Sequence, residues 1–346
     1  MRRLITTIGA VGLLTLVFVG GPKAVEACAG LIGPNGAVNL GRTTTLAAYD
    51  NGIEHYVTSF EFQGGGGEFG SLIPLPGVPT NVEKGGAWTL QRLEQETQPP
   101  VPEAAQSLRS AGAAFDEATV LQEVKIDALD ITVLEGGGES IAQWATEHGF
   151  RLSPDAPEVL DFYSQRSPIF LAAVFDGDAA AERGQALGDG TPVHITMPTT
   201  NPWVPLRILA LGKPAEDVVQ ANVYLLTDDR PALLWGNAEG TSITHSKPAT
   251  SLLLDDLRSD EGMGWVPQSA WLTKMEIDSA AGDMTFDLAV DASGQNQPSR
   301  VAAGLEILSE ADSGISMATI WTATALALVV LAGVAVLRMP RRSPQA

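Results

Sequence analysis

The alternation of apolar and polar side chains predicts several strands in the middle of the chain. Residues 52–62 alternate apolar and polar positions and stop at four consecutive glycines, whereas residues 169–175 form a continuous apolar run typical of a buried strand. Shorter β-rich segments occupy residues 193–197, 206–211, 221–226, 273–277 and 284–290. The last two flank a turn-rich loop, so we expect them to pair with each other.

Two segments show the helical period instead. In residues 139–149, Ile141, Trp144, Ala145 and His148 recur at helical spacing and a glycine ends the pattern. A second apolar stripe, over residues 159–163, follows a proline that suits a helix start. We also expect a mobile helix at residues 104–118 and loops over residues 98–102 and 236–264. The predicted fold class is α+β, strand-rich with a few helices.

The first 27 residues have the pattern of a secretory signal peptide. Arg2 and Arg3 precede an apolar run, and a helix break at residues 20–22 leads to small residues around Ala27. Cleavage after Ala27 or after Ala29 fits this pattern. An uncleaved membrane anchor and a twin-arginine signal are the alternatives, but the run is short for a span and paired arginines occur in ordinary signals.

Cys28 is the only cysteine of the chain and directly follows the predicted cleavage site. A lipoprotein would carry its acylated cysteine here, so lipidation of Cys28 and an unmodified thiol both stay open. Glu26 is unusual just before such a cleavage site, which favours the unmodified thiol. A single cysteine excludes a disulfide within the chain, so the outer domain must depend on its apolar core.

The opposite end predicts a transmembrane helix over residues 317–337. No charged residue occurs between Asp312 and Arg338. A span of this length reaches roughly 31 Å at a rise of about 1.5 Å per residue, which matches the hydrocarbon core of a bilayer. The arginines that follow place the C-terminus in the cytoplasm by the positive-inside rule. A sorting tail that a peptidase removes is the alternative, although no sorting motif precedes the helix.

The two ends divide the chain into five parts. These are a signal peptide (residues 1–27), an acidic extracytoplasmic domain (28–308), a polar stalk (309–316), the transmembrane helix (317–337) and a basic cytoplasmic tail (338–346). Residues 28–315 hold 15 Lys and Arg (21 less three before residue 28 and three after residue 315) and 40 Asp and Glu (41 less Glu26), a formal charge of −25. This charge disfavours nucleic-acid binding, which needs cations against phosphates. It suits cation binding or simple solubility.

No catalytic, cofactor-binding or metal-binding constellation stands out along the chain. The four histidines, His55, His148, His194 and His245, lie far apart and lack the local ligand pairs of zinc sites. We interpret each of them as structural or exposed. A Ser-His-Asp site assembled from distant residues stays open, because such sites are recognised by geometry and not by spacing.

Three further features have simpler explanations than ligand binding. The glycine run at residues 64–67 lacks the Lys-Ser/Thr of a phosphate loop and indicates a flexible connection. Acidic pairs near residues 176–178, 228–229 and 255–256 lack a full calcium-binding loop and indicate solvated turns. Trp203, Trp235, Trp265 and Trp271 could line a sugar or peptide groove, although tryptophan more often packs in cores or at their rims.

Several weak motifs, taken in order, resemble one known family. They occupy residues 27–30, 69–79, 129–134, 141–150, 159–163, 271–275 and 283–287. Together they are similar to the exported bacterial proteins catalogued as domain of unknown function 2330, over most of residues 27–290. The resemblance implies export and often a C-terminal membrane helix, but no activity, cofactor or catalytic residue. Many relatives carry further cysteines, so a disulfide role for Cys28 does not carry over.

The segment at residues 69–79 is the most family-like and contains three prolines. Proline removes a ladder donor, so we expect a core element that forms an edge or extended segment and not a central strand; a ligand groove is the alternative. For the whole chain we expect a membrane-anchored bacterial cell-surface protein with a non-catalytic module that binds an envelope protein, peptide or wall component. An extracytoplasmic hydrolase or transferase with a site assembled from distant residues is the alternative function.

Overall fold

The structure, a computed structural model, describes residues 25–26, 30–33, 36–37, 42–60, 70–98, 119–175, 191–236 and 239–306. Cys28, the helix expected at 104–118, the acidic turn at 176–178 and the predicted membrane segment at 317–337 lie outside these residues. No helix within the described residues combines the length and the apolar character that a membrane crossing requires.

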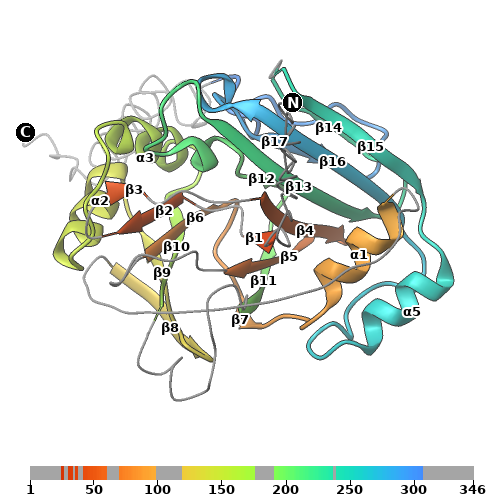
Figure 1. Ribbon diagram of the computed structural model, residues 1–346. Coiled ribbons are helices and arrows are strands. Elements are labelled where there is room, and N and C mark those ends of the chain that lie inside the picture. Colours follow the sequence, from red (N-terminus) through yellow and green to blue (C-terminus); the bar gives the residue numbers. More distant parts are fainter. Residues whose placement is uncertain are drawn as a thin grey trace, which may run out of the picture.

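Two large sheets form the body of the molecule (Figure 1). The eight-stranded sheet contains, in spatial order, β15 (Thr241–Pro248), β16 (Trp271–Ala280), β13 (Val218–Thr227), β4 (Arg42–Asp50), β5 (Ile53–Phe60), β11 (Thr191–Pro198) and β7 (Asn81–Lys84), with β1 (Val25–Glu26) beside β4. The six-stranded sheet contains β3 (Gly36–Ala37), β2 (Gly30–Gly33), β6 (Gly70–Leu75), β10 (Ile169–Phe175), β9 (Leu129–Glu135) and β8 (Thr119–Ile126). A small third sheet contains β12 (Trp203–Val204), β17 (Leu288–Asp291) and β14 (Ala232–Leu234).

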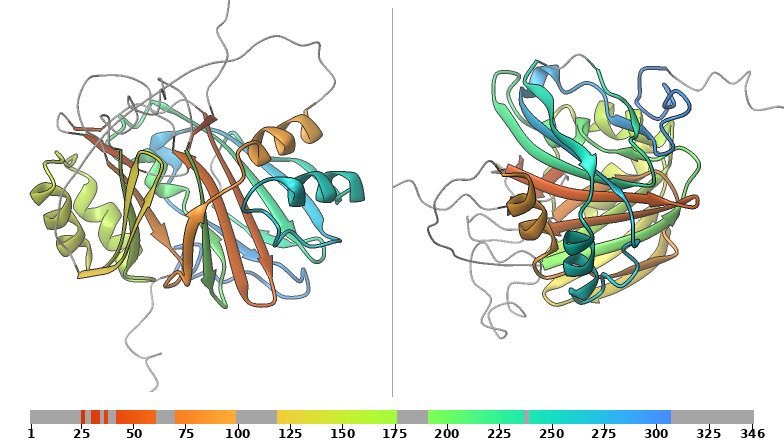
Figure 2. Two further views of the ribbon diagram at one scale, coloured as in Figure 1. Left: turned by 90° about the horizontal axis from the view of Figure 1, so that it is seen from below. Right: turned by 90° about the vertical axis from the view of Figure 1, so that its right-hand side faces the viewer.

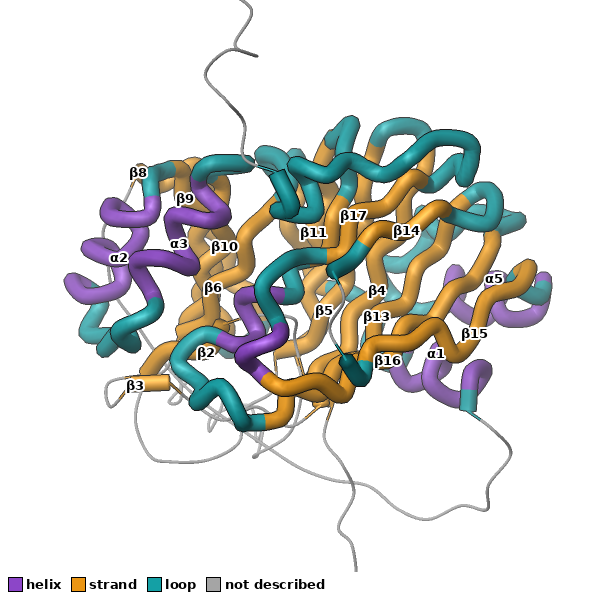
Figure 3. Tube along the Cα trace, turned by 90° about the horizontal axis from the view of Figure 1, so that it is seen from above, coloured by secondary structure: helices purple, strands orange, loops and turns teal. Residues whose placement is uncertain are grey.

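Helices cover the outer faces of both large sheets, at opposite ends of the molecule (Figures 2 and 3). Leucines of α1 (Thr89–Thr97) and α5 (Ser251–Ser259) pack on Leu46 and Val57 of the eight-stranded sheet. Side chains of α2 (Gly138–Glu147) and α3 (Ala156–Ser164) pack on the six-stranded sheet. A third apolar cluster joins the inner faces of the two sheets. The order of layers is therefore helix, sheet, sheet, helix, and it buries both faces of the central strands.

The predicted strand-rich α+β class is confirmed. The strand at 169–175 is present with the predicted bounds, and the strands at 52–62, 193–197 and 221–226 and the helix at 139–149 are present with shifted ends. Gly149 ends that helix with a φ of +80°, a conformation that glycine adopts without a steric penalty.

Three local predictions are wrong. Residues 206–211 form the 3₁₀ helix η1 (Arg207–Ala210) and not a strand, because their apolar side chains are divided between two clusters and do not line one face of a ladder. Leu206 and Leu209 belong to the cluster between the sheets, and Ile208 and Leu211 belong to the cluster under α2 and α3. Residues 273–277 and 284–290 do not pair: β16 pairs with β13 and β15, the 3₁₀ helix η2 (Ala281–Asp283) follows it, and β17 joins the third sheet. The expected loop at 236–264 contains β15 and α5, since sheet pairing and the Thr250 N-cap outweigh the local turn composition.

The proline-rich segment is a core element, as predicted, but its strand is not at an edge. All six residues of β6 are buried, and β6 pairs with β10 on one side and with β2 on the other. The pairing with β2 runs only from Gly70 to Leu72, so Pro74 faces β10 alone. The missing proline donor is thus tolerated because the sheet has already narrowed at that position.

Candidate functional site

The candidate site lies on the outer face of the eight-stranded sheet, where β5, β11 and β7 are neighbours. The antiparallel register sets His55 opposite Thr196 and Val57 opposite His194, so the two histidines are diagonal neighbours on one face. The next pairing sets His194 opposite Glu83 of β7. Strand pairing therefore brings together side chains that lie 139 residues apart in the sequence.

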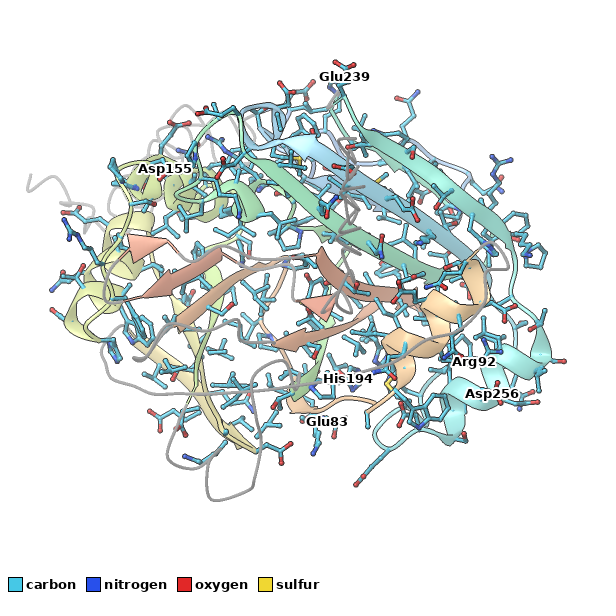
Figure 4. All side chains as sticks on the ribbon, in the orientation of Figure 1. Glu83, Arg92, Asp155, His194, Glu239 and Asp256 are labelled. Carbon is cyan, nitrogen blue, oxygen red and sulfur yellow. The ribbon has the colours of Figure 1, made fainter. Side chains whose placement is uncertain are left out.

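Three of these side chains form a continuous hydrogen-bonded chain. Oε1 of Glu83 lies 3.1 Å from Nδ1 of His194, and Nε2 of His194 lies 2.9 Å from Nδ1 of His55. Oγ1 of Thr196 also lies 3.2 Å from Nε2 of His194. His194 is 2% exposed and Glu83 is 48% exposed (Figure 4). The chain therefore passes from a half-exposed carboxylate through a buried imidazole to the partly exposed His55.

The indole of Trp265 covers the bond between the two histidines. The imidazole centres are 5.1 Å apart, which is close to the 2.9 Å nitrogen separation plus one ring radius on each side. The bond is therefore nearly collinear with the ring centres, the geometry that hydrogen bonds prefer. The indole lies parallel to His55 at 4.1 Å and 5.0 Å from His194, which places it over the line between the two rings.

This geometry defines which nitrogens carry hydrogen. A carboxylate only accepts hydrogen bonds, so His194 carries its hydrogen on Nδ1 and presents a lone pair at Nε2. The 2.9 Å contact then requires the hydrogen of His55 to lie on Nδ1. Nε2 of the partly exposed His55 consequently presents a lone pair, and no described residue donates to it.

Burial keeps both histidines neutral. Desolvation, and to a smaller extent the neighbouring His194, lower the pKa of His55 to about 4, against the opposing effect of Asp50 and Glu83. Desolvation likewise lowers the pKa of His194, although the Glu83 carboxylate opposes the shift. A chain of neutral imidazoles next to a carboxylate can accept and pass on hydrogen bonds at physiological pH.

Asp260 holds the two loops that frame the site. It is buried, and its carboxylate accepts hydrogen bonds from the backbone N–H groups of Ala87 and Trp88 and from the hydroxyl of Thr89. Those residues lead from β7 into α1, while Asp260 precedes the loop that carries Trp265. The Asp260 contacts thus fix the indole relative to Glu83, and an ion pair of Arg92 with Asp256 at 2.9 Å holds α1 to α5 (Figure 4).

Glu54 occupies the opposite face of the same strand. It is 1% exposed, and neither carboxylate oxygen has a hydrogen-bond partner among the described residues. Desolvation raises the pKa of Glu54 to about 8, so the group is protonated at neutral pH. The alternation along residues 52–62 suggests that one face of this strand is exposed to solvent. In the structure both faces of β5 are covered, so its polar residues are not on an exposed face.

The remaining histidines stay apart from this site. His148, directly after α2, stacks on Trp144, and its Nδ1 lies 2.6 Å from the Trp144 carbonyl oxygen. His245 lies on β15, opposite Lys274 of β16. Within the described ranges, no three His, Cys, Asp or Glu side chains are placed to hold a metal ion. The two nitrogens of the His55–His194 pair also point at each other and not toward a common point, as metal ligands would.

The four tryptophans named from the sequence have different surroundings. Trp265 covers the histidine pair, and Trp203 packs near the buried guanidinium of Arg166. Trp271 donates from Nε1 to the hydroxyl of Ser246, and Trp235 packs against the inter-sheet cluster. They do not form one groove. Glu83 and Glu54 were not predicted from the sequence. The strand register is needed to place Glu83 next to His194. The burial of Glu54 is evident only once the six-stranded sheet is packed against its face of β5.

The family comparison agrees with the resemblance seen in the sequence. The model described as "Uncharacterized protein conserved in bacteria (DUF2330)" matches residues 22–234. The chain belongs to this family. Glu83, His55 and His194 lie inside the matched region of DUF2330, and Trp265 lies beyond it. No curated protein matches the chain in sequence.

Among solved structures, a chain of the caspase-8/P35 complex aligns with a TM-score of 0.39 and 8% identity, over 72% of this chain and 96% of that one. The crystal structure of baculovirus P35 aligns with a TM-score of 0.38 and 8% identity, over the same shares of each chain. Similarity at this level establishes neither a shared fold nor a shared function.

Proposed function

We propose that this DUF2330 protein is a membrane-anchored module of the bacterial cell surface that binds an envelope component without converting it. The signal-like segment at 1–27 and the apolar segment at 317–337 support export and anchoring. The binding site is the His55, His194, Glu83 and Trp265 group, which we call the imidazole chain site.

The observation that carries binding over catalysis is the low pKa of His55. A general base is most effective when its pKa lies near the working pH. A histidine whose pKa is about 4 is a weak base at neutral pH, yet its neutral Nε2 is a good hydrogen-bond acceptor. The site is thus better suited to holding a ligand than to abstracting a proton from one.

A hydrolase or transferase is the second candidate, and one observation favours it. The Thr196 hydroxyl, His194 and Glu83 follow one another at 3.2 and 3.1 Å, the order of nucleophile, base and orienting carboxylate. Nε2 of His194 is already engaged by His55, however, so it serves two donors at once. A base shared in this way is less free to activate the hydroxyl.

Surface crosslinking of the full-length protein in its own membrane tests the proposal. We expect an envelope component to be recovered with the wild type and lost with His55→Phe, which keeps a ring beneath Trp265 but removes both nitrogens. His245→Phe on β15 is the matched control and should leave recovery unchanged. If the envelope component were recovered equally well with His55→Phe, the imidazole chain site would not be its binding site. If the wild type recovered no envelope component, the proposed binding function would be contradicted.

Topology and catalysis are tested separately. Protease added to intact protoplasts should digest the domain and spare a tag placed after residue 346. Incubation of envelope material with the wild type and with Thr196→Val should leave it chemically unchanged in both cases. Turnover by the wild type that Thr196→Val abolishes would instead support the hydrolase.

A further inference from the structure

Glu54 is buried close to the surface turn that joins β4 to β5. The strand register sets it directly opposite Tyr49 of β4 and Met197 of β11. Side chains alternate along a strand, so Glu54 shares its face of β5 with Tyr56, a member of the cluster between the two large sheets. The carboxyl group therefore lies in the layer between the sheets, only two residues after Gly52 of the turn.

The loop that joins β11 to β12, residues 199–202, is fastened to this turn by two hydrogen bonds. The N–H of Thr199 donates to the carbonyl of Gly52 at 3.0 Å, and the Tyr49 hydroxyl donates to the carbonyl of Thr199 at 2.8 Å. At the other end of the loop, the carbonyl of Pro202 accepts from a backbone N–H of β17. The residues between these points are exposed, so the attachment of this loop, which we call the Thr199 loop, depends on its two ends.

The surroundings of Glu54 suit a neutral carboxyl group and not a carboxylate. Neither of its oxygens has a hydrogen-bond partner among the described residues, Met197 faces it from β11, and the six-stranded sheet presents apolar side chains to this layer. Tyr49 is the titratable group that faces it from β4. Burial, and then the charges of Glu54 and Asp291, raise the pKa of Tyr49, so its hydroxyl keeps the hydrogen that it donates to Thr199. A carboxylate here would therefore need water.

We propose that the Thr199 loop is a proton-controlled lid, which is closed over protonated Glu54 and opens when Glu54 loses its proton. Opening breaks the two bonds of Thr199 and displaces the partly exposed Tyr49, which gives the carboxylate access to water. The lid lies on the opposite face of β5 from the imidazole chain site, and it does not depend on the proposed function.

The closed lid and the open lid bind the proton of Glu54 with different affinity. Burial raises the pKa of Glu54 to about 8 in the closed form, whereas the hydrated group ionises near 4.5. Between these two values the open form has lost the proton and the closed form still holds it. The opening equilibrium constant therefore rises by up to about tenfold per pH unit from pH 4.5 and levels off above pH 8.

Hydrogen exchange of the full-length protein in detergent, followed by mass spectrometry in peptides that contain Thr199, tests the lid. Because intrinsic exchange also accelerates with pH, the wild type is compared with Glu54→Gln at each pH. We expect the ratio of the two rates to rise by up to about tenfold per pH unit between pH 5 and pH 8. A ratio that does not change with pH would overturn the proposal. In the matched control Glu158→Gln, an exposed change on α3, the ratio of the wild-type rate to the variant rate should stay constant.

Urea separates opening of the lid from unfolding of the whole domain, which also exposes Glu54. Opening of a short loop exposes little surface, so urea below the unfolding transition should leave the exchange of Thr199 unchanged. If the exchange of Thr199 instead accelerates with urea as steeply as that of the central strand β13, Glu54 acts only through global unfolding and the lid is refuted.

Tyr49→Phe tests how the lid is fastened. This change removes the hydroxyl that donates to the carbonyl of Thr199, so Thr199 should exchange about threefold to tenfold faster at every pH. Unchanged exchange in folded Tyr49→Phe would contradict the role of Tyr49 in closing the loop. Circular dichroism checks the fold of each variant. If Glu54→Gln does not fold, Glu54→Met, which is also neutral and of similar length, takes its place in the comparison.

Discussion

Glu54 and His55 are adjacent residues of β5 whose side chains point to opposite faces of one sheet. Burial shifts the pKa values of these two side chains in opposite directions. Burial raises the pKa of Glu54 to about 8 and lowers the pKa of His55 to about 4, so both are neutral near pH 7. His55 has a partner in His194 and a cover in Trp265, whereas neither oxygen of Glu54 has a hydrogen-bond partner among the described residues. His55 thus belongs to a hydrogen-bonded site, whereas Glu54 is a buried polar group without compensating hydrogen bonds among the described residues.

A second buried carboxylate shows what Glu54 lacks. Asp287 is fully buried, but it accepts hydrogen bonds from the hydroxyl of Tyr163, the guanidinium of Arg166 and the backbone N–H groups of Leu206 and Arg207. These contacts tie α3 and η1 to the third sheet. Burial of a carboxylate is thus tolerated in this fold where donors surround it, and Glu54 remains the exception.

The largest effect is expected from replacing the ionisable side chain of Glu54 with a neutral one. Its folded-state pKa of about 8 exceeds the unfolded value of 4.5, so its contribution to stability is complete below pH 4.5 and is lost as pH rises to about 8. At about 1.4 kcal/mol per pH unit, Glu54→Gln should gain on the order of 5 kcal/mol over the wild type between pH 4.5 and pH 9. Urea unfolding across this range measures the difference. A difference that does not change with pH would show that Glu54 is hydrated or bonded in the folded protein.

Breaking the Asp287 pair should have the next largest effect. Asp287→Ala leaves the guanidinium of Arg166 buried without its counterion, 2.6 Å from the removed oxygen, so we expect a loss of roughly 3–5 kcal/mol of unfolding free energy. Glu158→Ala removes an exposed partner of Arg207 and should cost at most about 1 kcal/mol. Similar costs for the two variants in urea unfolding would contradict the distinction between organised and exposed pairs.

Removing the indole of Trp265 should bring the pKa of His55 closer to that of a solvated histidine. In Trp265→Leu, water reaches the histidine pair, so the desolvation that lowers the pKa of His55 decreases. We expect this pKa to rise by about one to two pH units toward 6.5, as measured by histidine NMR titration. Trp271→Leu, a change on β16 away from the pair, is the control. An unchanged pKa in Trp265→Leu would assign the desolvation to the sheet and not to the indole.

The smallest effect is expected from the exposed end of the chain. Glu83 raises the pKa of both histidines, so Glu83→Gln should lower both pKa values further. The unfolding free energy should change by less than about 1 kcal/mol, because the carboxylate is half exposed. A rise in either pKa would contradict the contact between Glu83 and His194.

The sequence predicts what local pattern determines. Residues 139–149 and 169–175 form the predicted helix and strand because the period and continuity of their apolar side chains agree with their burial. The structure of residues 206–211 and of β15 could not be predicted in this way. The apolar side chains of residues 206–211 are divided between two core clusters, and β15 is a mostly exposed edge strand. His55 and His194 appeared unrelated because strand register, and not spacing, places them together. The burial of Glu54 depends on a second sheet that its own segment does not encode.

Nitrogen-15 NMR of the histidine side chains tests the central claim most directly. The account predicts that His55 and His194 both carry hydrogen on Nδ1 at pH 7, and that His55 takes up a proton only near pH 4. Hydrogen on Nε2 of His55, or protonation of His55 near pH 6.5, would contradict the imidazole chain and the acceptor that it offers to a ligand.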